Sequence, residues 1–138
     1  MQRVMGVDYG DVRTGIALSV ANRFLASGIG TIKEGGMRST AKKVASLAAE
    51  HDVGIIVIGL PKNMDGSEGA SAQKIRAFAE LLGGLTDVQI EFFDERVSTM
   101  AAHQILNMTD TRGKQSKNVI DTLSAEIILQ NYLDKNSV

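Results

Sequence analysis

The chain has 138 residues, a length that suits one domain (residues 1–138) built around one hydrophobic core. Apolar residues make up 43% of it and charged residues 22%, which excludes a wholly disordered chain. A formal net charge of −1 and an aromatic content of 4% argue against a protein that coats nucleic acid through a global basic field or through base stacking. The absence of cysteine excludes a disulfide framework and fits a cytoplasmic protein, and the apolar run at residues 53–60 is too short to span a membrane.

Three short apolar stretches come first, at residues 3–7, 14–20 and 24–32. The second alternates between large apolar and small residues, which is typical of a half-buried strand. The short break at residues 21–23 suits a hairpin. The sequence therefore predicts an antiparallel meander of three strands at the start of the chain.

Helical spacing appears after the meander, behind Ser39 and Thr40, which are plausible helix caps. The continuous β-branched run at residues 53–60 predicts a strand that is buried on both faces and is therefore parallel and central. A second amphipathic helix, with apolar residues at 75–82, should end at Gly83–Gly84, because glycine tolerates a left-handed cap.

The last third of the chain predicts one more strand and two helices. Residues 88–93 alternate as a strand does, and a short helix is expected at residues 99–107. Residues 109–117 include no apolar residue and predict a loop, followed by a final helix at residues 118–133. The order βββ-α-β-α-β-α-α predicts an α/β fold with a mixed five-stranded sheet flanked by helices. This is the order of the ribonuclease H-like fold, and a flavodoxin-like sheet fits less well because it would not begin with three consecutive strands.

Three acidic residues stand where a structural role explains them only partly. Asp8 ends the first predicted strand, Glu95 follows the fifth, and Asp121 lies in the first turn of the predicted last helix. Each has an ordinary alternative: Asp8 as a turn residue, Glu95 as a solvated charge, and Asp121 as a partner of the helix dipole.

The predicted topology brings these three carboxylates to one edge of the sheet. The first strand is central and the fifth lies two places away, so their carboxyl ends open on the same edge, beside which the last helix can pack. Three clustered carboxylates would repel one another unless a cation neutralised them, and hard oxygen ligands favour Mg²⁺ or Mn²⁺. The sequence therefore predicts a metal site formed by Asp8, Glu95 and Asp121.

Four blocks of the sequence resemble one known family. They are "GVDYGDVRTGIALS", "VIGLPKNMDGSEGASAQKIRAFAELL", "FFDERVSTMAAHQIL" and "KNVIDTLSAEIILQNYL", which together cover nearly the whole chain. In this order they resemble the YqgF (RuvX-like) family of bacterial ribonuclease H-like nucleases. Members of that family are described as Holliday junction resolvases and as the nuclease that trims the precursor of small-subunit ribosomal RNA.

The resemblance implies that Asp8, Glu95 and Asp121 are catalytic, the trio that the topology brings together. The expected chemistry is two-metal-ion hydrolysis of a phosphodiester bond in ribosome biogenesis, with nucleic acid and ribosomal particles as partners. Two features differ from resolvases of the related RuvC type: Ser124 stands where they carry a second acid on the last helix, and the loop before that helix is only modestly basic. The residues expected to contact nucleic acid are Gly10, Arg13, Lys62, Asn63, Arg96, Thr99, Arg112, Lys114 and Lys117.

Three other functions remain open at this point. A resolvase acting on four-way DNA would use a similar site, and a non-enzymatic RNA-binding or transcription-accessory protein would not depend on Asp8. An actin-like ATPase or sugar kinase also opens with DxGxxxxG, as in "DYGDVRTG", but it needs a second lobe for which 138 residues leave no room.

Overall fold

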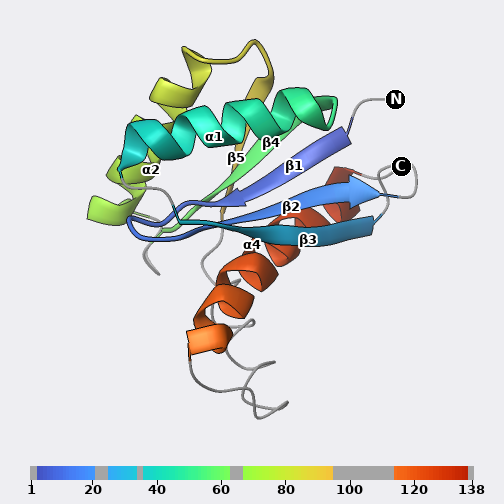
Figure 1. Cartoon of the computed structure of the whole chain (residues 1–138). Helices are drawn as coiled ribbons and strands as arrows, with labels where there is room; N and C mark the ends of the chain where they lie inside the picture. Colours follow the sequence, from blue (N-terminus) through green and yellow to red (C-terminus); the bar gives the residue numbers. More distant parts are fainter. Residues whose placement is uncertain (1–2, 21–24, 34–35, 63–66, 95–113, 137–138) are drawn as a thin grey trace.

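The computed structural model describes residues 3–20, 25–33, 36–62, 67–94 and 114–136, the stretch 114–121 by its backbone alone (Figure 1). In this part of the chain the elements are β1 (Arg3–Asp8), β2 (Thr14–Val20), β3 (Leu25–Ile32), α1 (Met37–Glu50), β4 (Val53–Leu60), α2 (Ala70–Gly83), β5 (Gln89–Asp94) and α4 (Lys114–Asn136).

The five strands form one sheet in the order β3-β2-β1-β4-β5. The first three strands pair antiparallel, whereas β4 is parallel to both of its neighbours, β1 and β5. This confirms the predicted mixed sheet, with the meander followed by βα units. The residues of β4 are buried along most of its length, as its β-branched run predicts.

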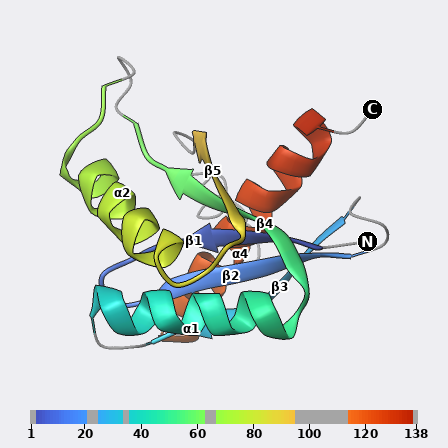
Figure 2. The ribbon, with the colours of Figure 1, turned by 90° about the horizontal axis from the view of Figure 1, so that it is seen from above.

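Helices cover both faces of the sheet (Figures 1 and 2). One core lies between the sheet and the pair α1 and α2, with Phe78 and Met5 among its largest fully buried side chains. A second, smaller core lies between the sheet and α4 and includes Val4, Ile128 and Leu129. None of the helices in the described ranges is long and apolar enough to cross a membrane.

The start of α1 and the cap conformation of α2 differ from the prediction. Helix α1 begins at Met37 after Gly36, so Ser39 and Thr40 are not caps; Thr40 lies inside the helix, where its hydroxyl donates a hydrogen bond of 3.0 Å to the Gly36 carbonyl. At the end of α2, Gly84 has a φ of −80°, which is right-handed backbone and not the left-handed cap that was expected. Helix α1 thus begins before its predicted cap residues, whereas α2 ends at Gly83 as predicted.

Helix α4 begins earlier than the sequence predicts. Its first described residue is Lys114, so residues 114–117 are helical and do not belong to the loop predicted for residues 109–117. Asp121 is consequently in the second turn and not the first, which removes the explanation that it complements the helix dipole, because that effect falls off within the first turn. The short helix predicted at residues 99–107 lies outside the described residues.

Candidate active site

Asp8 lies at the carboxyl end of β1, the middle strand of the sheet. It pairs in register with Gly15 of β2, and the preceding Val7 pairs with Ile58 of β4. Continuing the parallel register places Gly59, which has no side chain, beside Asp8. The ends of β1, β4 and β5 therefore share one edge of the sheet, here called the Asp8 edge, and Asp8 is half-buried there.

Asp8 is on the face of the sheet that α4 covers. Val4 packs in the core beneath α4, and a Cβ on Gly6 would lie 2.7 Å from Leu129 Cβ and 2.8 Å from the Ala125 carbonyl oxygen. Because side chains alternate along a strand, Asp8 shares the face of Val4 and Gly6. Glycine at position 6 thus lets the helix approach β1 closely.

The direction of α4 brings Asp121 to the same end of the sheet. On β3, the Ala26 amide donates to Gln130 Oε1 over 2.9 Å, whereas the Thr31 hydroxyl contacts the Thr122 hydroxyl at 2.9 Å. Helix α4 therefore runs antiparallel to β3, from the end where β3 stops towards the end where it starts. The backbone of Asp121 precedes Thr122 directly and lies at the Asp8 edge.

The other predicted acid and several predicted contact residues lie outside the described residues. Asp94, the last residue of β5, pairs with Leu60 of β4 at the Asp8 edge. The residue that follows it in the sequence, Glu95, is outside the described residues. The same holds for four residues predicted to contact nucleic acid: Asn63, Arg96, Thr99 and Arg112.

The turn after Asp8 is closed by hydrogen bonds to Thr14. The Gly10 amide donates to Thr14 Oγ1, and that hydroxyl donates to the Gly10 carbonyl, both over 3.4 Å. A Cβ on Gly10 would collide with the Arg13 carbonyl oxygen, and Gly10 does not have a positive φ. The tightness of the turn therefore requires glycine at position 10. The same turn holds the half-buried Arg13 at the Asp8 edge.

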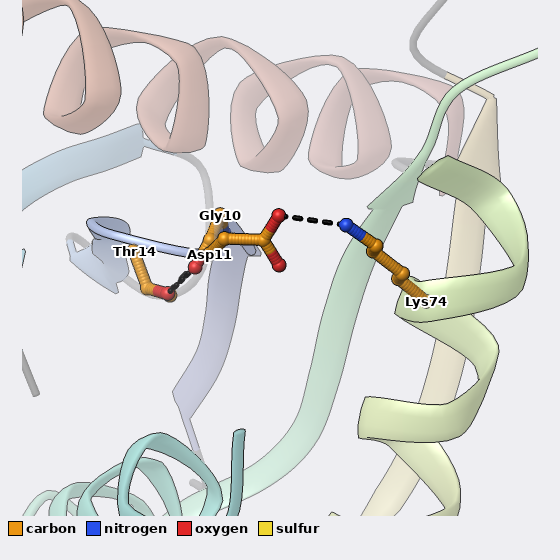
Figure 3. A network of polar contacts seen from close by, with 4 residues as sticks. All are labelled: Gly10, Asp11, Thr14 and Lys74. Carbon is orange, nitrogen blue, oxygen red and sulfur yellow. Dashed lines mark hydrogen bonds and ion pairs between the residues drawn. The ribbon is translucent and has the colours of Figure 1, made fainter. Parts of the chain in front are cut away.

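An ion pair that the sequence did not predict ties this turn to α2 (Figure 3). Lys74 Nζ lies 2.8 Å from Asp11 Oδ2, and both side chains are more than half exposed. The carboxylate of Asp11 raises the pKa of Lys74. Sixty-three positions separate the two residues, so no local pattern could have indicated the pair.

Tyr9 packs under the same turn, on the opposite face of the sheet from Asp8. Its ring stacks on Phe78 of α2 with 4.4 Å between the ring centroids. Burial, and secondarily the charge of Asp11, raises the pKa of the Tyr9 hydroxyl, while Lys74 opposes this effect. A cavity of about 100 Å³ lies between the turn and α2, lined by Tyr9, Gly10, Asp11, Ser71, Lys74 and Ile75.

Lys62, predicted to contact nucleic acid, is half-buried just beyond the end of β4. The pKa of the Glu68 carboxyl is lowered mainly by a bidentate hydrogen bond from Arg76, with 2.6 Å for each contact. The positive charge of Lys62 lowers this pKa further. Lys114 and Lys117 lie on the first turn of α4 and not on a loop, so their backbone is fixed by the helix.

Within the described residues no three acidic, histidine or cysteine side chains form a metal-binding group. Asp8 is the one predicted ligand whose side chain is described. The chemistry of its surroundings fits a hard cation, because a half-buried carboxylate faces a position on β4 that carries no side chain.

Comparison with known proteins was carried out on both sequence and structure. A family model described as RuvX, Holliday junction resolvase, matches residues 2–135. A relative from Clostridioides difficile (strain 630), named pre-16S rRNA nuclease, is 42% identical over 132 residues and covers 96% of this chain and 94% of its own. A relative of the same name from Endomicrobium trichonymphae is 40% identical over 138 residues, 99% of each chain.

Solved structures with a similar fold include two resolvases. RuvC of T. thermophilus, in complex with a Holliday junction substrate, has a TM-score of 0.62 and 11% identity and covers 100% of this chain and 98% of its own. The fowlpox virus resolvase, in complex with Holliday junction DNA, has a TM-score of 0.61 and 10% identity over 99% and 100% of the two chains. At this identity the likeness establishes the fold, which is ribonuclease H-like, as the sequence predicted.

Proposed function

Because this chain belongs to the RuvX family, we propose that it is a metal-dependent nuclease that hydrolyses phosphodiester bonds in the precursor of 16S ribosomal RNA. The observation that carries the proposal is the meeting of Asp8 and the backbone of Asp121 at one edge of the sheet, on the face covered by α4. The relatives' name supports the choice of RNA substrate, and ribosomal particles are the setting in which such a precursor is trimmed.

The three predicted carboxylates have different supports in this proposal. Asp8 ends the central strand β1, which pairs with β2 on one side and β4 on the other, so its backbone is fixed by the sheet. Asp121 belongs to α4, and the close packing of α4 against Gly6 sets the distance between this helix and β1. Glu95 follows β5 directly in the sequence and completes the set.

These residues would hold Mg²⁺ or Mn²⁺, two ions in the mechanism that we propose. Bound there, the metal would supply an activated water and stabilise charge on the leaving oxygen. In this proposal the protein's part is to bring carboxylates to one edge of the sheet, which is supported by the paired backbone of β1 for Asp8 and by the packing of α4 for the Asp121 backbone.

Positive side chains around this edge would orient the substrate. Arg13, just before β2, and Lys62, just beyond β4, are half-buried on either side of β1, where each can meet a phosphate oxygen. We propose the same role for Lys114 and Lys117 on the first turn of α4, and for the remaining predicted contacts. Gly10 contributes indirectly, because it closes the turn that carries Arg13. The predicted contacts outside the described residues are Asn63, Arg96, Thr99 and Arg112.

A second function, resolution of four-way DNA junctions, is favoured by the family description and by the shared fold with RuvC. The site would be the same, and only the shape of the substrate would differ. Ser124 stands one helical turn after Asp121 and is fully buried, so the last helix does not supply a second acid at that position.

The test compares Asp8→Asn with Asp11→Asn on two substrates. Both changes replace a carboxylate by an amide, at positions three residues apart, but Asp11 lies in the turn after β1, is exposed and is paired with Lys74. We expect Asp8→Asn to lower Mg²⁺-dependent cleavage of labelled precursor rRNA by more than about 100-fold while binding persists, and Asp11→Asn to cleave at the wild-type rate.

The outcomes separate the alternatives. Faster cleavage of four-way DNA than of precursor rRNA would assign the resolvase function. Unchanged cleavage by purified Asp8→Asn would refute the catalytic role of that carboxylate, and cleavage by neither wild-type protein nor variant, with RNA bound tightly by both, would favour a non-enzymatic role.

A further inference from the structure

Four exposed cations lie close together where β3 leads into α1. We call them the α1 basic surface: Lys33, Arg38, Lys42 and Lys43. None of the four makes a hydrogen bond or an ion pair with the part of the chain that the structure describes. In a chain of net charge −1, this is a local positive field with which no described acidic side chain forms an ion pair.

Stability of α1 does not explain these charges. Arg38 is in the first turn of the helix, and Lys42 and Lys43 are also in its first half, where the helix dipole disfavours positive charge. The first turn has no acidic residue and the last turn no basic one, and Glu50, the acid of this helix, ends it. The charge order is the reverse of the one that stabilises a helix, which indicates a function outside the helix.

The α1 basic surface begins at the Asp8 edge. Asp8 pairs with Gly15 of β2, and Gly15 pairs with Thr31 near the end of β3. Lys33 follows that strand end, and α1 starts at Met37 before it runs back along the sheet towards the start of β4 (Figure 2). The basic half of α1 is therefore the half near the candidate active site.

The spacing of the cations suits a repeating anion. Arg38 and Lys42 are four residues apart, on one side of the helix and about 6 Å apart along its axis. A nucleic-acid strand presents a phosphate at about every 3.4 Å of helix axis, so the two side chains can reach different phosphates of one strand. Lys43 adds a positive charge on the adjacent side of the helix, and Lys33 extends the positively charged surface towards the Asp8 edge.

We propose that the α1 basic surface binds the phosphate backbone of the nucleic acid that flanks the cleaved bond. The inference rests on the proposed nuclease function, because the shared edge with Asp8 is what favours a polynucleotide over other anions. The contacts are electrostatic and independent of base sequence. They place the substrate on both faces of the sheet at the Asp8 edge, with α4 and Asp8 on one face and α1 on the other.

The experiment measures the salt dependence of binding to a labelled precursor-rRNA duplex, with chelator present to prevent cleavage. Arg38→Gln, Lys42→Gln and Lys43→Gln are made singly and together. The slope of log K against log salt concentration is negative, and each lost phosphate contact should reduce its magnitude by about 0.9. The magnitude for the triple variant should therefore be smaller than that of the wild type by about 2.7. Arg3→Gln is the charge-matched control, because Arg3 is exposed at the opposite end of β1, and its slope should equal that of the wild type.

A footprint on the unaltered protein provides a second readout. Bound RNA duplex should protect Lys33, Lys42 and Lys43 from acylation. A triple-variant slope equal to that of Arg3→Gln, or lysines labelled equally with and without RNA, would overturn the proposal. A larger loss of binding to phosphatidylserine vesicles than to RNA would also overturn it, in favour of a lipid surface.

Failure of this inference is distinct from failure of the proposed function. The triple variant should raise KM for cleavage and leave kcat within about twofold of wild type, because no substituted residue lies at the carboxylate site. If Asp8→Asn cleaves normally while the triple variant loses its salt slope, the catalytic assignment fails and the binding surface stands. The reverse pair of results rejects the binding surface alone.

Discussion

Two buried serines show how the same side chain can stabilise or destabilise this fold. Ser19 Oγ accepts a hydrogen bond of 2.8 Å from the Val4 amide, at a point where the pairing of β1 with β4 is irregular. Ser124 Oγ is fully buried and has no hydrogen-bond partner among the described residues. An unsatisfied buried hydroxyl costs about 1–3 kcal/mol.

We therefore expect Ser124→Ala to raise the free energy of unfolding by about 1 kcal/mol in denaturant titrations. The matched change Ser19→Ala should lower it by about 1–3 kcal/mol, because the Val4 amide would be left buried without an acceptor. A lower stability of Ser124→Ala would contradict this view and would mean that its hydroxyl is used in the folded protein.

Tyr9 should make the protein sensitive to alkaline pH. Its hydroxyl has a pKa above the ordinary 10.0, chiefly because of burial and secondarily because of Asp11. The unfolded chain therefore loses this proton first, so the stability present below about pH 10 falls as the pH rises from there through the folded pKa. Tyr9→Phe, compared with wild type by urea unfolding at pH 8 and pH 11, should lose less stability over this interval. An equal loss in both proteins would show that Tyr9 does not contribute.

At the scale of elements, a glycine on β1 sets how closely α4 packs against the sheet. Gly6→Ala would push a methyl group against Leu129 and the Ala125 carbonyl, so the helix would have to shift. We expect a loss of about 1–3 kcal/mol of stability and, because α4 carries Asp121, slower cleavage at a temperature where the variant is still folded.

The control for this change is Gly83→Ala in α2, where the nearest atom to the added Cβ is Ile90 Cδ1 at 3.9 Å. There the extra methyl should stabilise the helix by up to about 1 kcal/mol and leave cleavage unchanged. If both variants cleave RNA equally well per folded molecule, the position of α4 does not control the site.

The same elements show what the sequence could predict and what it could not. The strands were predictable because alternation in β2 and the continuous apolar run in β4 are local patterns, and strand order followed from them. The start of α4 was not, because residues 114–117 have no apolar side chain, so hydrophobic periodicity gave no signal there. Two further contacts join residues far apart in the chain, so no local pattern indicates them. They are the ion pair of Asp11 with Lys74 and the close packing of α4 against Gly6.

At the scale of the whole molecule, metal binding should couple to stability. If carboxylates gather at the Asp8 edge, Mg²⁺ binds the folded state and not the unfolded one. It should then stabilise the fold by about 2.7 kcal/mol at a concentration 100 times its Kd. Thermal unfolding should show this upward shift of Tm in wild type and in Asp11→Asn, but not in Asp8→Asn. A shift of equal size in Asp8→Asn would place the metal elsewhere.

The division of the core between the two faces of the sheet has a consequence for synthesis of the protein. Within the described residues, Val4, Ala17 and Val57, on one face, are covered by α4, which follows all five strands in the sequence. Until residues 114–136 have been made, this apolar face lacks the helix that packs on it, and Asp121 is absent. Synthesis of α4 must therefore precede burial of this face and, under the proposed function, assembly of the carboxylate site.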